Sequence, residues 1–187
     1  LASLIVIINL AVTVISDPTV AGTAVNFLAK NCPNPLLIIK DPILRADKKN
    51  NVYRFGVCFD GSAKAIAVLK TVIDMMDDCD KLTVITCKEA NIKMDGIEKQ
   101  ISQVYESHPA GSRLERPKMV VLEREAGQNV YKAIQHYLIS QGQCDCYIDF
   151  VAVGNTGVNY LKNKGTTLGS VANMVVRAKR MNVIFAP

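Results

Sequence analysis

Two stretches of the sequence carry residues suited to binding a phosphorylated ligand. In the first, Asp60-Gly61-Ser62, the aspartate can cap a helix or accept hydrogen bonds from a ribose hydroxyl or an adenine amine. In the second, Gly154-Asn155-Thr156-Gly157 is followed after eleven residues by Gly169-Ser170. Glycines let backbone N–H groups approach a phosphate, and a helix N-terminus carries about half a positive charge. The pattern predicts a phosphate site; the alternative is that the glycines only form turns and Ser170 is an N-cap.

The sequence lacks the motifs of the common nucleotide-dependent enzymes. No G-x-G-x-x-G follows an apolar run, and no glycine is followed by lysine, which disfavours a dinucleotide site and a P-loop. The two loops hold no pair of carboxylates, activated nucleophile or histidine. Glu123 and Glu125 follow a different apolar run, and His108 and His136 lie on or beside predicted helices. We therefore expect a binding protein rather than an enzyme, with an ATP hydrolase as the alternative.

The composition is that of an ordinary globular protein. Of the 187 residues, 49% are apolar and 21% are charged, which excludes a disordered chain. The net charge of +5 is spread along the sequence rather than gathered in one stripe, so a nucleic-acid partner is not favoured. The six cysteines form no C-x-x-C pair, and Cys144 with Cys146 makes half a metal site at best. We expect thiols in a reducing compartment, and hence a cytoplasmic protein without a bound metal.

Short apolar runs alternate with longer segments of helical periodicity from residue 51 onward. The runs predict strands over residues 53–59, 82–87, 119–122, 147–153 and 183–185. The periodic segments predict helices over residues 63–76, 97–105, 130–138 and 170–179. Strands that alternate with helices predict an α/β fold: an open, parallel, five-stranded sheet with helices on both faces, Rossmann-like in class.

The N-terminal segment repeats the last third of this unit. Residues 4–8 correspond to the strand that ends at 150–153, and Gly22-Thr23 corresponds to Gly169-Ser170, each followed by an amphipathic helix and a short apolar strand. Residues 1–43 are therefore predicted to be the C-terminal part of a preceding, similar domain, residues 44–51 a linker, and residues 52–187 a complete domain. The alternative is that two ordinary strand–helix–strand segments resemble each other by chance.

The apolar start of the chain allows two interpretations. Residues 1–15 are too short for a membrane span of about 20 residues and lack the basic start of a signal peptide. We favour a buried strand in a chain that begins inside a longer protein, and expect no membrane association; a membrane or export segment is the alternative. A half-repeat buries too little apolar surface to fold alone, so it should dock on the complete domain or on another chain. Strands 36–40 and 183–185, each last in its unit, are expected to pair within the chain or between copies.

The runs FGVCFDGS and VAVGNTG…LGS together resemble the universal stress protein family. The resemblance covers about residues 51–187 and, more weakly, 1–43. The family pattern is G-x2-G-x9-G-[S/T], and this chain has Gly154-x2-Gly157-x11-Gly169-Ser170, which is two residues longer. In the N-terminal copy, Asn9 and Val12 replace the glycines, and Gly22-Thr23 follows at the family spacing.

The resemblance implies an adenine nucleotide ligand, ATP or AMP, with or without Mg²⁺, in a stress-response or signalling protein of the adenine nucleotide alpha hydrolase-like fold. The family's last strands often pair antiparallel across a dimer. By motif position, the implied ligand contacts are Asp60 with the base or ribose, Cys58 and Cys87 at the adenine end, Val153 and Gly154 along the sugar, and Gly157, Gly169, Ser170 and Val171 at the phosphates. Because the longer loop can displace Gly157 from the helix, the alternative is a structural or partner-binding module with a degenerate pocket.

Overall fold

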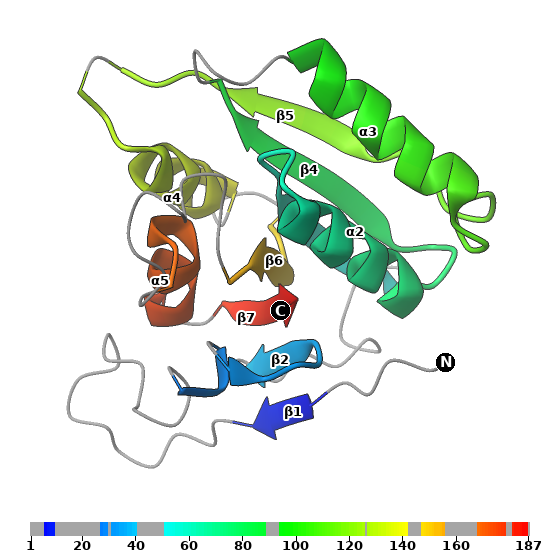
Figure 1. The fold of residues 1–187 in the computed structure, drawn as a ribbon, viewed down its shortest axis with the longest axis horizontal. Helices are drawn as coiled ribbons and strands as arrows, with labels where there is room; N and C mark the ends of the chain where they lie inside the picture. Colours follow the sequence, from blue (N-terminus) through cyan, green and yellow to red (C-terminus); the bar gives the residue numbers. More distant parts are fainter. Residues whose placement is uncertain are drawn as a thin grey trace.

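The computed structural model describes residues 6–9, 27–29, 31–40, 51–88, 94–125, 127–141, 147–155, 168–178 and 181–186. Together they form one seven-stranded sheet with helices on both of its faces (Figure 1). The strands are β1 (Val6–Asn9), β2 (Leu36–Ile39), β3 (Arg54–Cys58), β4 (Lys81–Cys87), β5 (Lys118–Leu122), β6 (Phe150–Gly154) and β7 (Asn182–Ala186). The main helices are α2 (Ala63–Met75), α3 (Met94–Ser107), α4 (Val130–Gln141) and α5 (Ser170–Arg177).

The strand order is β1-β2-β7-β6-β3-β4-β5, with β3 near the middle. From β7 to β5 all neighbouring strands are parallel, which confirms the predicted open, five-stranded parallel sheet. The two N-terminal strands extend the same sheet: β2 pairs antiparallel with β7, and β1 pairs parallel with β2. Of the two predicted ways for the terminal strands to pair, the structure shows pairing within the chain.

Two apolar clusters hold the helices on opposite faces of the sheet. One cluster joins α2 and α3 to one face and contains Val57 and Val84. The other joins α4 and α5 to the opposite face and contains Cys58 and Ile85. These strand residues alternate between the clusters because successive side chains of a strand point to opposite faces. The predicted helices on both faces are therefore confirmed, and connections from neighbouring strands can leave the sheet on different sides.

The predicted start of β6 is wrong by three residues. The apolar run begins at Tyr147, but the strand begins at Phe150. The preceding residue, Asp149, instead bridges to β3: its N–H donates to the Arg54 carbonyl at 2.8 Å, and its Oδ2 accepts the Arg54 N–H at 2.8 Å. The buried Asp149 carboxylate thus takes the place of a backbone carbonyl as the acceptor of the Arg54 N–H.

Several predictions fall partly or wholly outside the described residues. Of the apolar start, residues 1–15, only β1 is described. Cys144 and Cys146 lie outside the described residues, as do Gly22-Thr23 and Gly157. Within the described part of the chain, no helix is both long and apolar enough to cross a membrane.

Candidate functional site

The candidate site lies where the strand order changes direction, at the carboxyl ends of β3 and β6. These strands are parallel neighbours, with Phe55 opposite Phe150 and Val57 opposite Ala152. From β3 the chain continues into α2 on one face of the sheet, and from β6 it leads to α5 on the other face. In open α/β sheets, ligands bind at this kind of switch point. Asp60, two residues after β3, and Gly154, at the end of β6, therefore lie at the edge where such folds bind their ligands.

Two side chains stabilise the Asp60 loop, and each accepts a different backbone N–H. Asp60 Oδ1 accepts the Ser62 N–H at 3.0 Å, and Ser62 Oγ accepts the Ala65 N–H at 3.1 Å as the N-cap of α2. Gly61 between them has φ +79°, a left-handed conformation that glycine adopts without steric cost. The alternative that Asp60 itself caps the helix is therefore wrong. Asp60 fixes the turn, and its half-buried carboxylate stays at the sheet edge.

Backbone hydrogen bonds join the end of β6 to the start of α5. The Gly169 N–H donates to the Asn155 carbonyl at 3.0 Å, and the Asn155 N–H donates to the Ala186 carbonyl at 3.4 Å. Gly169 is the N-cap of α5 and has no side-chain cap, so the alternative that Ser170 is the N-cap is also wrong. The first N–H groups of a helix have no acceptor within it. The first turn of α5, with the amides of Ser170 and Val171, therefore lies close to the end of β6.

Asn155 is a candidate ligand contact to which the sequence analysis assigned no role. Its side-chain Oδ1 is buried and has no hydrogen-bond partner among the described residues. A buried acceptor left without a donor costs about 1–3 kcal/mol. A ligand hydroxyl, an amine or a water molecule would remove that cost. Nothing in the sequence marks this oxygen, because its burial depends on how the strand end packs.

The residues that the resemblance placed at the base and sugar are largely internal. Cys58 is 8% exposed and Cys87 is 5% exposed, and Cys58 belongs with Val153 to the cluster beneath α4 and α5. Burial, aided by the nearby negative charge of Asp60, raises the pKa of the Cys58 thiol to about 12. A ligand at the strand ends would therefore contact the backbone of Cys58 and Cys87 rather than their buried thiols. Val171 is half-buried against the same cluster.

A polar hollow of about 550 Å³ lies at the same edge of the sheet, at the ends of β4 and β5. Lys88, one residue after β4, forms an ion pair with Glu123 at 3.3 Å, and Arg124 Nη1 donates to the Gln128 carbonyl at 3.3 Å. Glu123 and Glu125 follow a strand, as the sequence predicts, whereas no pattern in the sequence indicates the hollow. Its lining residues are Lys88, Glu123, Arg124, Glu125, Gly127, Gln128 and Asn129.

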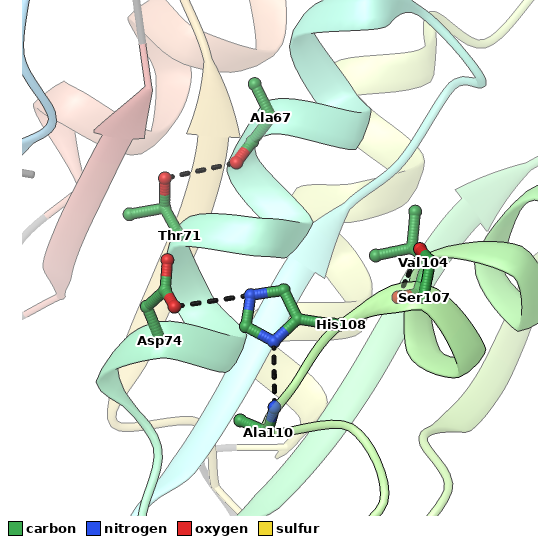
Figure 2. A network of polar contacts seen from close by, with 7 residues as sticks. All are labelled: Ala67, Thr71, Asp74, Val104, Ser107, His108 and Ala110. Atoms are coloured by element: carbon green, nitrogen blue, oxygen red, sulfur yellow. Dashed lines mark hydrogen bonds and ion pairs between the residues drawn. The ribbon is translucent and has the colours of Figure 1, made fainter. Parts of the chain in front are cut away.

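His108 has a structural position at the other end of the helices. Figure 2 shows its ring between α2 and the turn after α3, with Nε2 3.2 Å from Asp74 Oδ1 and Nδ1 accepting the Ala110 N–H at 3.2 Å. Both helices run back from the carboxyl edge of the sheet, so these contacts lie at the amino edge. Because both ring nitrogens are engaged there, His108 is not a base for the candidate site. Among the described residues, no three potential metal-ligating side chains come together.

The chain is similar to several solved structures. No protein-family model matches it, and no curated protein matches it by sequence. A functionally unknown protein from Pseudomonas aeruginosa PAO1 and a proposed universal stress protein from P. aeruginosa UCBPP-PA14 each superpose with a TM-score of 0.58 at 13% identity, over 97% of this chain and 62% of theirs.

A universal stress protein from Archaeoglobus fulgidus DSM 4304 gives a TM-score of 0.52 at 19% identity, over 84% of this chain and 50% of its own. The chain thus spans between 50% and 62% of the length of these three structures. At such low identity the similarity establishes the fold and not the function. The chain has the fold of the universal stress proteins, as the resemblance in its sequence predicted.

Proposed function

We propose that this chain binds an adenine nucleotide, ATP or AMP, at the carboxyl ends of β3 and β6, and acts in stress response or signalling without strong catalysis. One observation carries the proposal: the hydrogen bond from the Gly169 N–H to the Asn155 carbonyl. It brings the start of α5 to the strand end beside Asp60. The amides at the start of α5 can then donate to an anion, while the Asp60 carboxylate after β3 can accept hydrogen bonds from a sugar or a base.

The roles of the residues follow from their chemistry. The Asp60 carboxylate would accept hydrogen bonds from ribose hydroxyls or an adenine amine, and Asn155 Oδ1 would accept another. The amides at Ser170 and Val171 would donate to phosphate oxygens. A hydrogen bond to a charged group contributes about 1.5–3 kcal/mol, and this range applies both to bonds that the Asp60 carboxylate accepts and to bonds that the α5 amides donate to a phosphate.

The expected lack of strong catalysis rests on the groups at the site. Hydrolysis of a nucleotide needs a group that activates or orients water. Among the described residues of the two loops, the one carboxylate is that of Asp60, and it already accepts the Ser62 N–H. Steady phosphate release by the wild-type chain that disappears in Asp60→Asn would argue for a hydrolase instead.

Calorimetric titration of ATP, with Mg²⁺, and of AMP tests the proposal. Asp60→Asn removes the negative charge but keeps an oxygen that can accept the Ser62 N–H, so the loop should persist. We expect it to weaken ATP binding roughly ten- to hundredfold. The matched control is Asp78→Asn, whose exposed carboxylate pairs with Arg113 at 3.6 Å, away from the site. Absence of saturable binding by the wild-type chain at millimolar ATP would contradict the proposal and favour a partner-binding module.

We also propose that residues 1–43 are the C-terminal part of a second unit of the same fold, joined through a linker at 44–51 to the unit at 52–187. Alignment of Gly22-Thr23 with Gly169-Ser170 makes Leu37 the equivalent of Ile184. In the sheet, Leu37 pairs with Ile184, and the flanking pairs are Leu36 with Phe185 and Ile38 with Val183. The equivalent residues thus meet at the centre of the antiparallel pair, as a local twofold relation between two units requires.

The pairing of β1 supports the same domain organisation. Asn9 lies opposite Ile39 in the first pair of strands, and Gly154 lies opposite Ala186 in the second. Since Ile39 and Ala186 are equivalent in the alignment, Asn9 is the equivalent of Gly154. The glycine pattern in the sequence also aligns Asn9 with Gly154, independently of the structure. A chance resemblance between two strand–helix–strand pieces would not be expected to reproduce both registers.

A further inference from the structure

Lys40 lies against the end of α5 that is remote from the candidate site. Its Nζ is 3.1 Å from the Val175 carbonyl, 2.5 Å from the Val176 carbonyl and 2.8 Å from the Ala178 carbonyl. Its backbone N–H donates to Asn182 Oδ1 at 2.9 Å. The last carbonyls of a helix have no donor within it, and a lysine ammonium has three N–H donors. Lys40 therefore supplies further donors at the C-terminus of α5, beside the Ala178 N–H, which donates to the Val175 carbonyl at 3.2 Å.

The contact matters because α5 is short. An isolated helix of eight residues is not stable in water, so its position depends on what it packs against. On the sheet side, α5 is anchored by the buried side chains of Ala172, Val175 and Val176. In its last turn, the exposed Arg177 bonds to Asn173 within the same helix and so does not tie α5 to the sheet. Lys40 supplies a polar anchor from another element.

The charged form of Lys40 is present under ordinary conditions. Burial lowers the pKa of its amine to about 8. At pH 7 and below the group is therefore mostly an ammonium. A positive charge at this position also interacts favourably with the negative end of the helix dipole. The N-terminal segment thus holds one end of α5 while the other end borders the candidate site.

We propose that Lys40 is a positioning residue for the nucleotide site, through which the N-terminal segment sets the affinity for phosphate. Lys40 does not touch the ligand. It holds α5 so that the amides at Gly169, Ser170 and Val171 stay beside Asn155. This inference rests on the proposed function, but the hold of Lys40 on α5 can be measured without a ligand.

The first experiment is hydrogen–deuterium exchange of the peptide at 168–178 in the ligand-free chain. Lys40→Met removes the charge and keeps a long, unbranched side chain. We expect it to speed exchange in α5 roughly tenfold. The control Lys70→Met removes an exposed lysine from α2 and should leave this peptide unchanged. Lys40→Arg keeps the charge and should recover part of the protection, which also covers the case in which Lys40→Met folds poorly.

The second experiment compares ATP with adenosine by calorimetry. If Lys40 positions the phosphate-binding amides, Lys40→Met should weaken ATP binding roughly two- to fivefold and leave adenosine binding unchanged. An equal loss for both ligands, or unchanged exchange in α5, would overturn the inference. If the wild-type chain binds no ATP, the proposed function fails, while faster exchange in Lys40→Met would still confirm the hold on α5.

Discussion

Ile38→Ala tests whether the N-terminal strand β2 is an integral part of the sheet. The Ile38 side chain is 0% exposed, and it lies opposite Val183 in a cluster that also contains Leu36 and Phe185. Truncation of a fully buried isoleucine to alanine costs about 2–5 kcal/mol. Domains of this size are stable by about 5–15 kcal/mol, so the loss is a large fraction of the total.

The effect can be measured by urea unfolding followed by far-UV circular dichroism. The slope increases with chain length, and at about 2.5 kcal/mol per molar urea the midpoint should fall by about 1–2 M in a single transition. The matched control is Ile139→Ala on α4, where the side chain is 59% exposed, and the expected change is within about 0.5 kcal/mol. Equal midpoints for the two variants would refute the placement of β2. A separate early transition in Ile38→Ala would instead show that β2 unfolds independently of the sheet.

Two further predictions concern the β7 edge and the cysteines. All residues of β7 are buried, and removal of residues 1–50 uncovers this strand. The shortened chain should therefore dimerise through antiparallel β7 strands centred on Ile184. If light scattering shows a monomer, this prediction is wrong. At pH 8, the exposed Cys79 should be alkylated readily, whereas Cys58, with its pKa raised to about 12, should react only after denaturation, as peptide mapping can show. Because the Cys58 pKa is above its usual 9.0, the contribution of the protonated thiol to the free energy of unfolding is complete below pH 9 and declines between about pH 9 and 12. If the free energy of unfolding depends on pH in the same way in Cys58→Ala, this prediction is wrong.

The sequence predicted the architecture because hydrophobic periodicity is a local signal. Strand and helix patterns alternate from residue 51 onward, and parallel strands with crossover helices are the arrangement that this alternation favours. The repeat also predicted that the strands at 36–40 and 183–185 would pair. The structure shows that pairing within the chain.

The details of the candidate site were less predictable because they depend on packing. Asp60 and Ser62 are both good helix caps, and their spacing alone does not decide which of them caps α2. The burial of Cys58 follows from the helices α4 and α5 that cover its side of the sheet. The contact between Lys40 and α5 joins residues 135 positions apart and has no signature in either segment.

The antiparallel junction between β2 and β7 also decides where a second ligand could bind. Strands β1 and β2 run opposite to β7 and to the rest of the sheet, so their carboxyl ends lie at the other rim (Figure 1). Any pocket at the carboxyl ends of β1 and β2 would therefore open on the opposite side from Asp60. Two ligands held in this way would lie at opposite rims of the sheet, and the contact between Lys40 and α5 would be one route between them.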